Sequence, residues 1–199
     1  GVLLGLAALL AVAAAGLFWW LTERNDPRAL RAGIAAYQSG NRAEARRQFE
    51  QAAERASGNA LPHVYLARLA REDGDVARAT THAEAAIRAD TGSALARREM
   101  GQLLLQTDRP DLASRFLTAA VERDPQDRVA MGWLACATHR LGDVALTARF
   151  AQRAGQGDWS GCLAAPPGGR GAPPPGAVPG ARPAMPPGAV PGATPPAPV

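Results

Sequence analysis

The chain has 199 residues, with 22 basic and 18 acidic side chains and a net charge of +4. Its basic residues are all arginine, and they are mixed with Glu and Asp instead of forming a basic stripe with interleaved aromatic residues. This pattern is typical of solvated helix faces and excludes nucleic acid as an expected partner. The abundance of Ala, Gly, Pro and Arg is typical of a GC-rich, bacterial genome.

Residues 1–22 are predicted to form a transmembrane helix. Residues 2–21 carry no charge, and at helical rise they span roughly 30 Å, about the thickness of a bilayer core. Trp19 and Trp20 lie at the end of this run, where indole rings favour the membrane interface. The alternative is a secretory signal peptide with a cleavage region at residues 13–15, but no basic region precedes the apolar run.

The side of the membrane on which the rest of the chain lies is open. Arg24, Arg28 and Arg31 follow the apolar run, which by the positive-inside rule favours the cytoplasm. Single N-terminal anchors in bacteria more often carry their domain outward, and long domains cross largely regardless of charge. We expect a single-pass protein of the bacterial inner (cytoplasmic) membrane, with a slight preference for the periplasmic side.

A 34-residue repeat dominates the middle of the chain. Its turn residues are Gly40, Gly74, Asp108 and Gly142. Small residues recur in register five and twelve places later, at Ala45, Ala79, Ala113 and Thr147, and at Ala52, Ala86, Ala120 and Ala154. A period that holds four times without a slip indicates a repeat architecture.

Each turn residue separates two runs with an apolar spacing near 3.6, so each unit is predicted to be a helical hairpin. A single hairpin cannot bury its apolar stripe alone, whereas stacked hairpins can. We therefore predict an all-α protein whose residues 26–158 form an α-solenoid of four helix-turn-helix repeats, at about 26–59, 60–93, 94–127 and 128–158.

These units resemble the tetratricopeptide repeat (TPR) family. The first unit matches its pattern with Gly33, Gly40, Ala45, Phe49 and Ala52, and the third with Gly101, Ala113, Leu117, Ala120 and Pro125. The second unit departs from the pattern at Ala83, and the fourth at Thr147 and Ala151. The resemblance implies a solenoid that binds other proteins, and it does not identify them.

The resemblance also implies that the first helix of each unit lines a concave groove. The polar and aromatic residues carried onto that groove are Tyr37, Arg68, Arg71, Arg98, Gln102, His139 and Arg140. Leu30 and Ile34 make the groove apolar near the membrane. An arginine-lined groove suits carboxylates or acidic segments of a partner, and the alternative is that these arginines pair with nearby Glu and Asp.

Chemistry-bearing residues are few and scattered. The histidines have no metal-ligand spacing, and there is no nucleophile motif, phosphate loop or paired acids. Cys136 and His139 form C-A-T-H, which is not a haem attachment sequence, and no helper ligands are visible. A small buried cysteine beside a polar histidine is the favoured interpretation. We expect no enzyme activity, metal, cofactor or small-molecule substrate.

The end of the solenoid lacks the polar capping helix that such folds usually carry. Either Trp159 and Leu163 fold over the fourth repeat or a partner covers it, and we favour partner contact. Cys136 and Cys162 are either bridged or free. Residues 159–199 are predicted to form an extended Pro/Gly/Ala-rich tail, because this composition cannot bury a core.

Three functional hypotheses follow. The first is a membrane-anchored interaction scaffold that binds and stabilises or assembles a larger membrane protein complex. The second is a stoichiometric accessory subunit of a respiratory or photosynthetic membrane complex. The third is a transient assembly chaperone of the cytochrome-maturation or envelope-biogenesis type. In all three the partners are membrane-complex proteins and the lipid bilayer.

Overall fold

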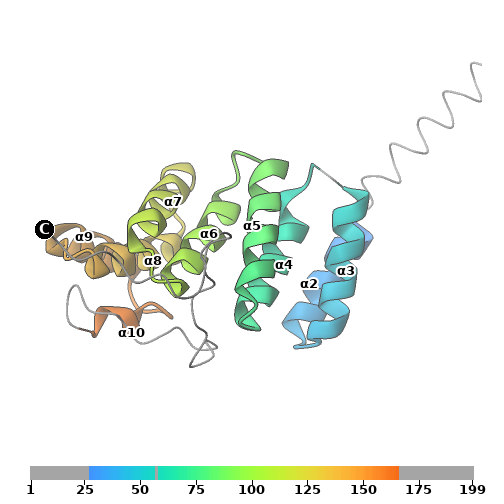
Figure 1. Ribbon diagram of the computed structural model, residues 1–199, viewed down its shortest axis with the longest axis horizontal. Coiled ribbons are helices and arrows are strands. Elements are labelled where there is room, and N and C mark those ends of the chain that lie inside the picture. The colour runs from blue at the N-terminus through green and yellow to red at the C-terminus, as the bar shows by residue number, and fades with distance from the viewer. Residues whose placement is uncertain (1–26, 57, 166–199) are drawn as a thin grey trace, which may run out of the picture.

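The computed structural model describes residues 27–56 and 58–165, which form an all-helical solenoid (Figure 1). The helices are α2 (Arg28–Gln38), α3 (Arg42–Arg55), α4 (Ala60–Glu72), α5 (Val76–Ala89), α6 (Ala94–Gln106), α7 (Pro110–Arg123), α8 (Arg128–Arg140), α9 (Val144–Ala154) and α10 (Ser160–Leu163). From α2 to α9 they form four consecutive hairpins, which confirms the predicted repeat solenoid.

The hairpins stack in chain order along the long axis of the molecule (Figure 1). Each hairpin packs its two helices together, and its first helix also packs on the second helix of the hairpin before it, as α4 does on α3. Among the first helices, α6 also contacts α4 and α8 directly. We call the layer formed by α2, α4, α6 and α8 the inner layer.

The four turns share one backbone conformation. Gly40, Gly74 and Gly142 have φ of 78–79°, and Asp108 at the same place in the third hairpin has φ of 58°. After each turn residue, an amide N–H donates five residues back along the chain, as Asn41 does to the carbonyl of Ala36 at 2.9 Å. This is the Schellman pattern, in which a left-handed residue ends a helix and satisfies its last carbonyls.

Small residues let the two helices of a hairpin approach closely. A Cβ added to Gly33 would lie 2.6 Å from the ring of Phe49, and one added to Gly101 would lie 2.5 Å from Cγ of Leu117. Phe49 and Leu117 are fully buried as a result. In the second hairpin Ala67 and Ala83 take these places and share a cluster with Met100 of the next hairpin. In the second hairpin the large side chain that packs on this pair thus comes from the next repeat.

Two predictions concern residues outside the described part of the chain. The membrane segment at residues 1–22, with Trp19 and Trp20, lies before it, and most of the tail, residues 166–199, lies after it. Within residues 27–56 and 58–165, no helix has the length and apolar character needed to cross a bilayer.

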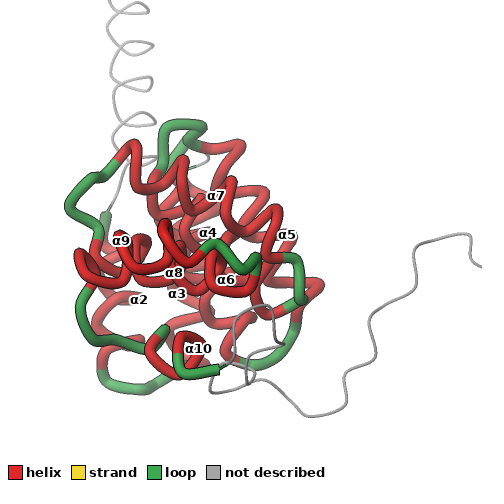
Figure 2. The backbone as a smooth tube through the Cα atoms, turned by 90° about the vertical axis from the view of Figure 1, so that its left-hand side faces the viewer, coloured by secondary structure: helices red, strands yellow, loops and turns green. Residues whose placement is uncertain are grey.

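The start of the predicted tail differs from expectation. Residues 159–165 do not leave the solenoid as an extended chain, since they include α10 and pack against α8. Figure 2 shows α10 beneath the last hairpin, on the side away from α7. The physical reason is that Trp159, Cys162 and Leu163 are apolar enough to bury against the fourth repeat despite the glycines between them.

The left-handed turns predict that alanine lowers stability at a turn glycine and not at a glycine with negative φ. Gly40→Ala forces a Cβ into a left-handed residue although the added atom meets nothing within 4 Å, so it isolates backbone strain. We expect a loss of about 1–2 kcal/mol in the free energy of unfolding, measured by urea denaturation.

The matched control is Gly58→Ala, where an added Cβ also meets nothing and φ is not positive. This variant is expected to keep or slightly raise stability, by less than about 1 kcal/mol. Equal losses for the two variants would contradict the assigned turn geometry.

Candidate partner-binding surface

Every residue predicted to line the groove lies on the inner layer, but the structure gives most of these side chains internal partners. The most buried contact centres on Glu99 of α6, whose exposed fraction is 2%. Arg68 of α4 donates from Nε to Glu99 at 3.0 Å, and Arg71 donates to the second carboxylate oxygen at 3.4 Å. A carboxylate this buried is stable only when it is paired and hydrogen-bonded, so both arginines serve the fold.

Arg98 makes the equivalent link one repeat further on. Its guanidinium donates to Asp127 at 2.7 Å, and the other oxygen of Asp127 accepts the amide N–H of Ala130 at 2.9 Å. Asp127 is thus the N-cap of α8 and the ion partner of α6 at once. Asp127 therefore both caps the first helix of the fourth repeat and links that repeat to the third.

The first junction uses Tyr37 and Glu72. The Tyr37 hydroxyl donates to Glu72 at 2.7 Å, and Arg42 donates to the other oxygen of that carboxylate at 2.7 Å. Burial, and then the hydrogen bond to Glu72, raise the pKa of Tyr37 to about 12. Tyr37 is therefore a neutral donor that ties α2 to α4.

Arg140 closes the series at the fourth repeat. It donates to the backbone carbonyl of Leu105 at 2.7 Å and lies 3.9 Å from Asp108. Burial lowers the pKa of Arg140 from its ordinary value, with Asp108 acting in the opposite direction. Gln102 is buried in α6.

These contacts bear on the two interpretations of the arginines. In the centre of the inner layer Arg68, Arg71 and Arg98 face two carboxylates, Glu99 and Asp127, which leaves one positive charge in excess. Glu99 and Asp127 offset most of this charge, so these arginines are held by ion pairs between repeats. Binding of an acidic partner segment to them stays a prediction, and the structure favours the alternative of internal pairing.

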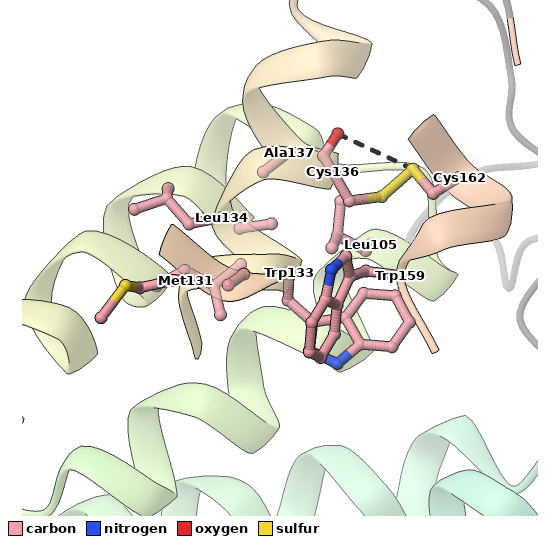
Figure 3. Close-up of a cluster of buried hydrophobic side chains, with 11 residues drawn as sticks. Leu105, Met131, Trp133, Leu134, Cys136, Ala137, Trp159 and Cys162 are labelled. Atoms are coloured by element: carbon pink, nitrogen blue, oxygen red, sulfur yellow. Dashed lines mark hydrogen bonds between the residues drawn. A yellow bond between two sulfur atoms is a disulfide. The ribbon is translucent and has the colours of Figure 1, made fainter. Parts of the chain in front are cut away.

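The C-terminal residues of the described chain lie against α8 (Figure 3). Trp159 is buried with Leu105, Met131 and Trp133, and Leu163 packs against the same cluster. A disulfide joins Cys136 to Cys162, with 5.7 Å between their Cα atoms. Trp159 and Leu163 therefore fold back on α8, which is the alternative that we did not favour, while Val144 at 70% and Leu146 at 39% exposure leave α9 open, so partner contact at that helix stays a prediction.

Sequence reasoning missed Gly132 as part of this arrangement. A Cβ at Gly132 would lie 2.0 Å from the indole of Trp159, so only glycine leaves room for that ring. The signal was a glycine at a place in α8 where the family pattern does not ask for one. His139 also has an internal contact, since its Nε2–H donates to the carbonyl of Ala165 at 2.7 Å.

A second histidine site lies between α4 and α5. The rings of His63 and His82 stack with centroids 5.7 Å apart. Burial lowers the pKa of both, and nearby cations lower it further, Arg88 for His63 and Arg78 and Arg46 for His82. Within the described ranges no three His, Cys, Asp or Glu side chains are grouped so that they could hold a metal ion.

The comparisons with known proteins agree with this geometry. Residues 70–132 match the family model of the tetratricopeptide repeat. The match runs from the end of α4 into α8, so it covers α5, α6 and α7 and less than half of the chain. No curated protein matches the sequence of this chain.

Two solved structures show the same fold at low sequence identity. An O-GlcNAc transferase from Thermobaculum terrenum is similar with a TM-score of 0.57 and 23% identity, over 63% of this chain and 25% of that one. YrrB, a TPR protein with an unusual peptide-binding site, is similar with a TM-score of 0.52 and 17% identity, over 75% of this chain and 80% of YrrB. This chain corresponds to about a quarter of the transferase, so the likeness concerns the repeats alone.

The buried carboxylate in α6 carries a stability prediction. Glu99→Gln removes the charge that Arg68 and Arg71 share, and we expect a loss of about 3 kcal/mol in the free energy of unfolding, as for other broken buried pairs. Glu84→Gln is the control, because Glu84 pairs with Arg88 in the open and should change stability by less than about 0.5 kcal/mol. Equally small losses of stability for the two variants would contradict the role of Glu99 in holding the two arginines. Urea denaturation measures both.

The histidine pair predicts a loss of stability in mild acid. The pKa of an unfolded histidine is about 6.5, and both folded pKa values lie below it, so the unfolded chain binds more protons near that pH. The contribution of His63 and His82 to stability is complete above the unfolded pKa, and it is lost as pH falls through 6.5 toward the folded values. The denaturation midpoint should therefore drop from pH 7.5 to pH 5.5. His63→Gln/His82→Gln should flatten this drop, and an unchanged slope would contradict it.

Proposed function

We propose that this protein is a non-catalytic, membrane-anchored scaffold that binds other proteins and stabilises or assembles a larger membrane protein complex. The observation that carries the proposal is the TPR-type solenoid itself, whose fold serves protein–protein interaction. The peptide-binding site named for YrrB supports the same kind of partner, an extended or helical protein segment.

The inner layer supports this proposal by shape and apolar character more than by charge. Leu30 and Ile34 of α2 are half-buried beside Tyr37, and Gln38 at the end of the same helix is exposed. The cations further along are held by Glu99 and Asp127. The partner segment is therefore proposed to contact the first repeat through apolar groups.

The membrane part of the proposal rests on residues 2–21, which carry no charge and end in Trp19 and Trp20. The compartment is supported by the Cys136–Cys162 disulfide, because disulfides persist in oxidising surroundings such as the bacterial periplasm. We propose that the repeats lie on the periplasmic side of the inner membrane.

An accessory-subunit role is the second candidate, and one observation favours it. The turn after α8 and the first turn of α9 carry exposed apolar side chains, with Leu141 at 49%, Val144 at 70% and Leu146 at 39% exposure. Adjacent exposed apolar residues mark interaction surfaces. A permanent subunit is expected to bury more than roughly 1,600 Å² against its partners, whereas a transient chaperone is not.

The first test is extraction of the tagged full chain from native membranes in mild detergent, followed by sizing and mass spectrometry. Comigration with one membrane complex at fixed stoichiometry would support the subunit role, and a shifting set of membrane proteins would support an assembly role. Migration of the chain alone would contradict the scaffold proposal.

A pair of variants then tests which face is used. Gln38→Arg adds a charge to the exposed end of α2, and Thr118→Arg adds the same charge to an exposed place on α7, outside the inner layer. We expect Gln38→Arg to reduce co-purification of partners about tenfold, the effect of roughly 1.4 kcal/mol, and Thr118→Arg to leave it unchanged. The reverse result would place the partner on the outer helices.

A further inference from the structure

We propose that residues 155–165 are a removable cap over a second binding site, on the inner face of α8, and that this site takes a tryptophan-bearing peptide once the Cys136–Cys162 disulfide is reduced. We call residues 155–165 the cap. The proposal deepens the scaffold function above and rests on it only for the identity of the incoming peptide.

The site is one face of α8. Gly132, Cys136 and His139 are spaced by four and three residues, so they lie along one side of the helix. The cap contacts all three: Trp159 lies on Gly132, Cys162 is bonded to Cys136, and Ala165 accepts from His139. The chain thus places its own peptide where the family resemblance places a ligand.

The tryptophan is held mainly by shape. Added Cβ atoms at Gly132 and Gly157 would lie 2.0 Å and 2.3 Å from the indole of Trp159, so the ring packs closely against two glycine backbones. Its Nε1–H donates to the carbonyl of Gly155, within the cap itself, at 3.0 Å. The inner face of α8 therefore supplies an apolar contact for an indole ring and forms no hydrogen bond with the indole N–H. A peptide that satisfies its own indole N–H fits the same place.

The backbone contact gives the site a polar anchor. The Nε2–H of His139 donates to the carbonyl of Ala165, a group that every peptide carries. An aromatic anchor in an apolar place, joined by one backbone hydrogen bond, is a common way to bind short segments. The side chain of Cys162 adds the covalent link that a free peptide lacks.

The cap is separable from the solenoid. Among the described helices, α10 makes extensive contact with α8 alone. Gly155, with φ of 70°, ends α9 and begins the cap, so the cap can leave without unwinding α9. The disulfide adds a second covalent tether to the backbone link at Gly155, and with both in place the cap excludes a competing peptide.

Opening requires a dithiol reductant, either a protein dithiol or a small one. The dithiol transfers two electrons and two protons to the Cys136–Cys162 bond, which becomes two thiols, while the reductant is oxidised to its own disulfide. Release then removes Trp159 from the buried cluster that it shares with Trp133 and Leu105. A peptide indole that covers them again restores the lost apolar burial.

Amide hydrogen exchange on the full chain in detergent micelles tests the cap. Reduction by dithiothreitol should speed exchange in residues 155–165 at least about tenfold and leave α4 and α6 unchanged. Equal protection of the cap in the oxidised and reduced chain would overturn the proposal, because the cap would then be a permanent part of the core.

Peptide binding tests the site itself. The probe is a fluorescent synthetic peptide with the sequence of residues 155–165 carrying Cys162→Ser. The full chain with Trp159→Ala/Cys162→Ser, which empties the site, should bind the probe, and the oxidised unmodified chain should bind it at least about tenfold more weakly. Equal binding by both chains, or by neither, would overturn the proposal.

Two controls keep the result specific. The same probe carrying Trp159→Ala should lose binding, and this control does not depend on any change in the chain. Gly132→Leu added to the emptied chain fills the indole place and should also abolish binding. If the cap fails both tests while the unmodified chain still comigrates with a membrane complex, only this inference is lost. If the probe binds but no complex comigrates, only the scaffold proposal is lost.

Discussion

Each hairpin leaves one side of its helices apolar and cannot cover it alone, and the rest of the structure depends on this constraint. Leu66 and Leu69 of α4 complete the cluster begun by Ala45 and Phe49 of α3, and later repeats continue the same pattern. The stack therefore grows in one direction, with close intrahairpin contacts such as Gly101 on Leu117 setting the spacing. The constraint becomes a problem only where the stack ends.

The polar side chains of the inner layer follow from the same stacking. Glu99 of the third repeat is buried at the junction with the second repeat and requires cations there, and Arg68 and Arg71 of the second repeat supply them. Within a single repeat, these arginines could bind an acidic partner. Once the repeats are stacked, they pair with a carboxylate of the adjacent repeat. Partner recognition is accordingly proposed to rest on apolar and backbone contacts, with the arginines fixing the angle between repeats.

The inner face of the last repeat is closed by the chain itself. Trp159 covers this face of α8, and the bond between Cys136 and Cys162 holds it there. This face is thus closed by a covalent bond, while α9 stays exposed. The bond also makes closure dependent on the redox state, which links the architecture to the compartment proposed for it.

The sequence by itself determined the repeat, its 34-residue period and the four turns, because left-handed turn residues and small helix-packing residues are local requirements that recur at fixed places. It also identified the inner-layer helices through the family resemblance. Only the tertiary structure decided which partner each charge takes, since Arg68 and Glu99 lie 31 residues apart and meet through stacking. It likewise decided the position of Trp159, because its ring packs on the backbone of Gly132. The absence of a side chain at Gly132 creates a contact surface only when a distant part of the chain packs against it.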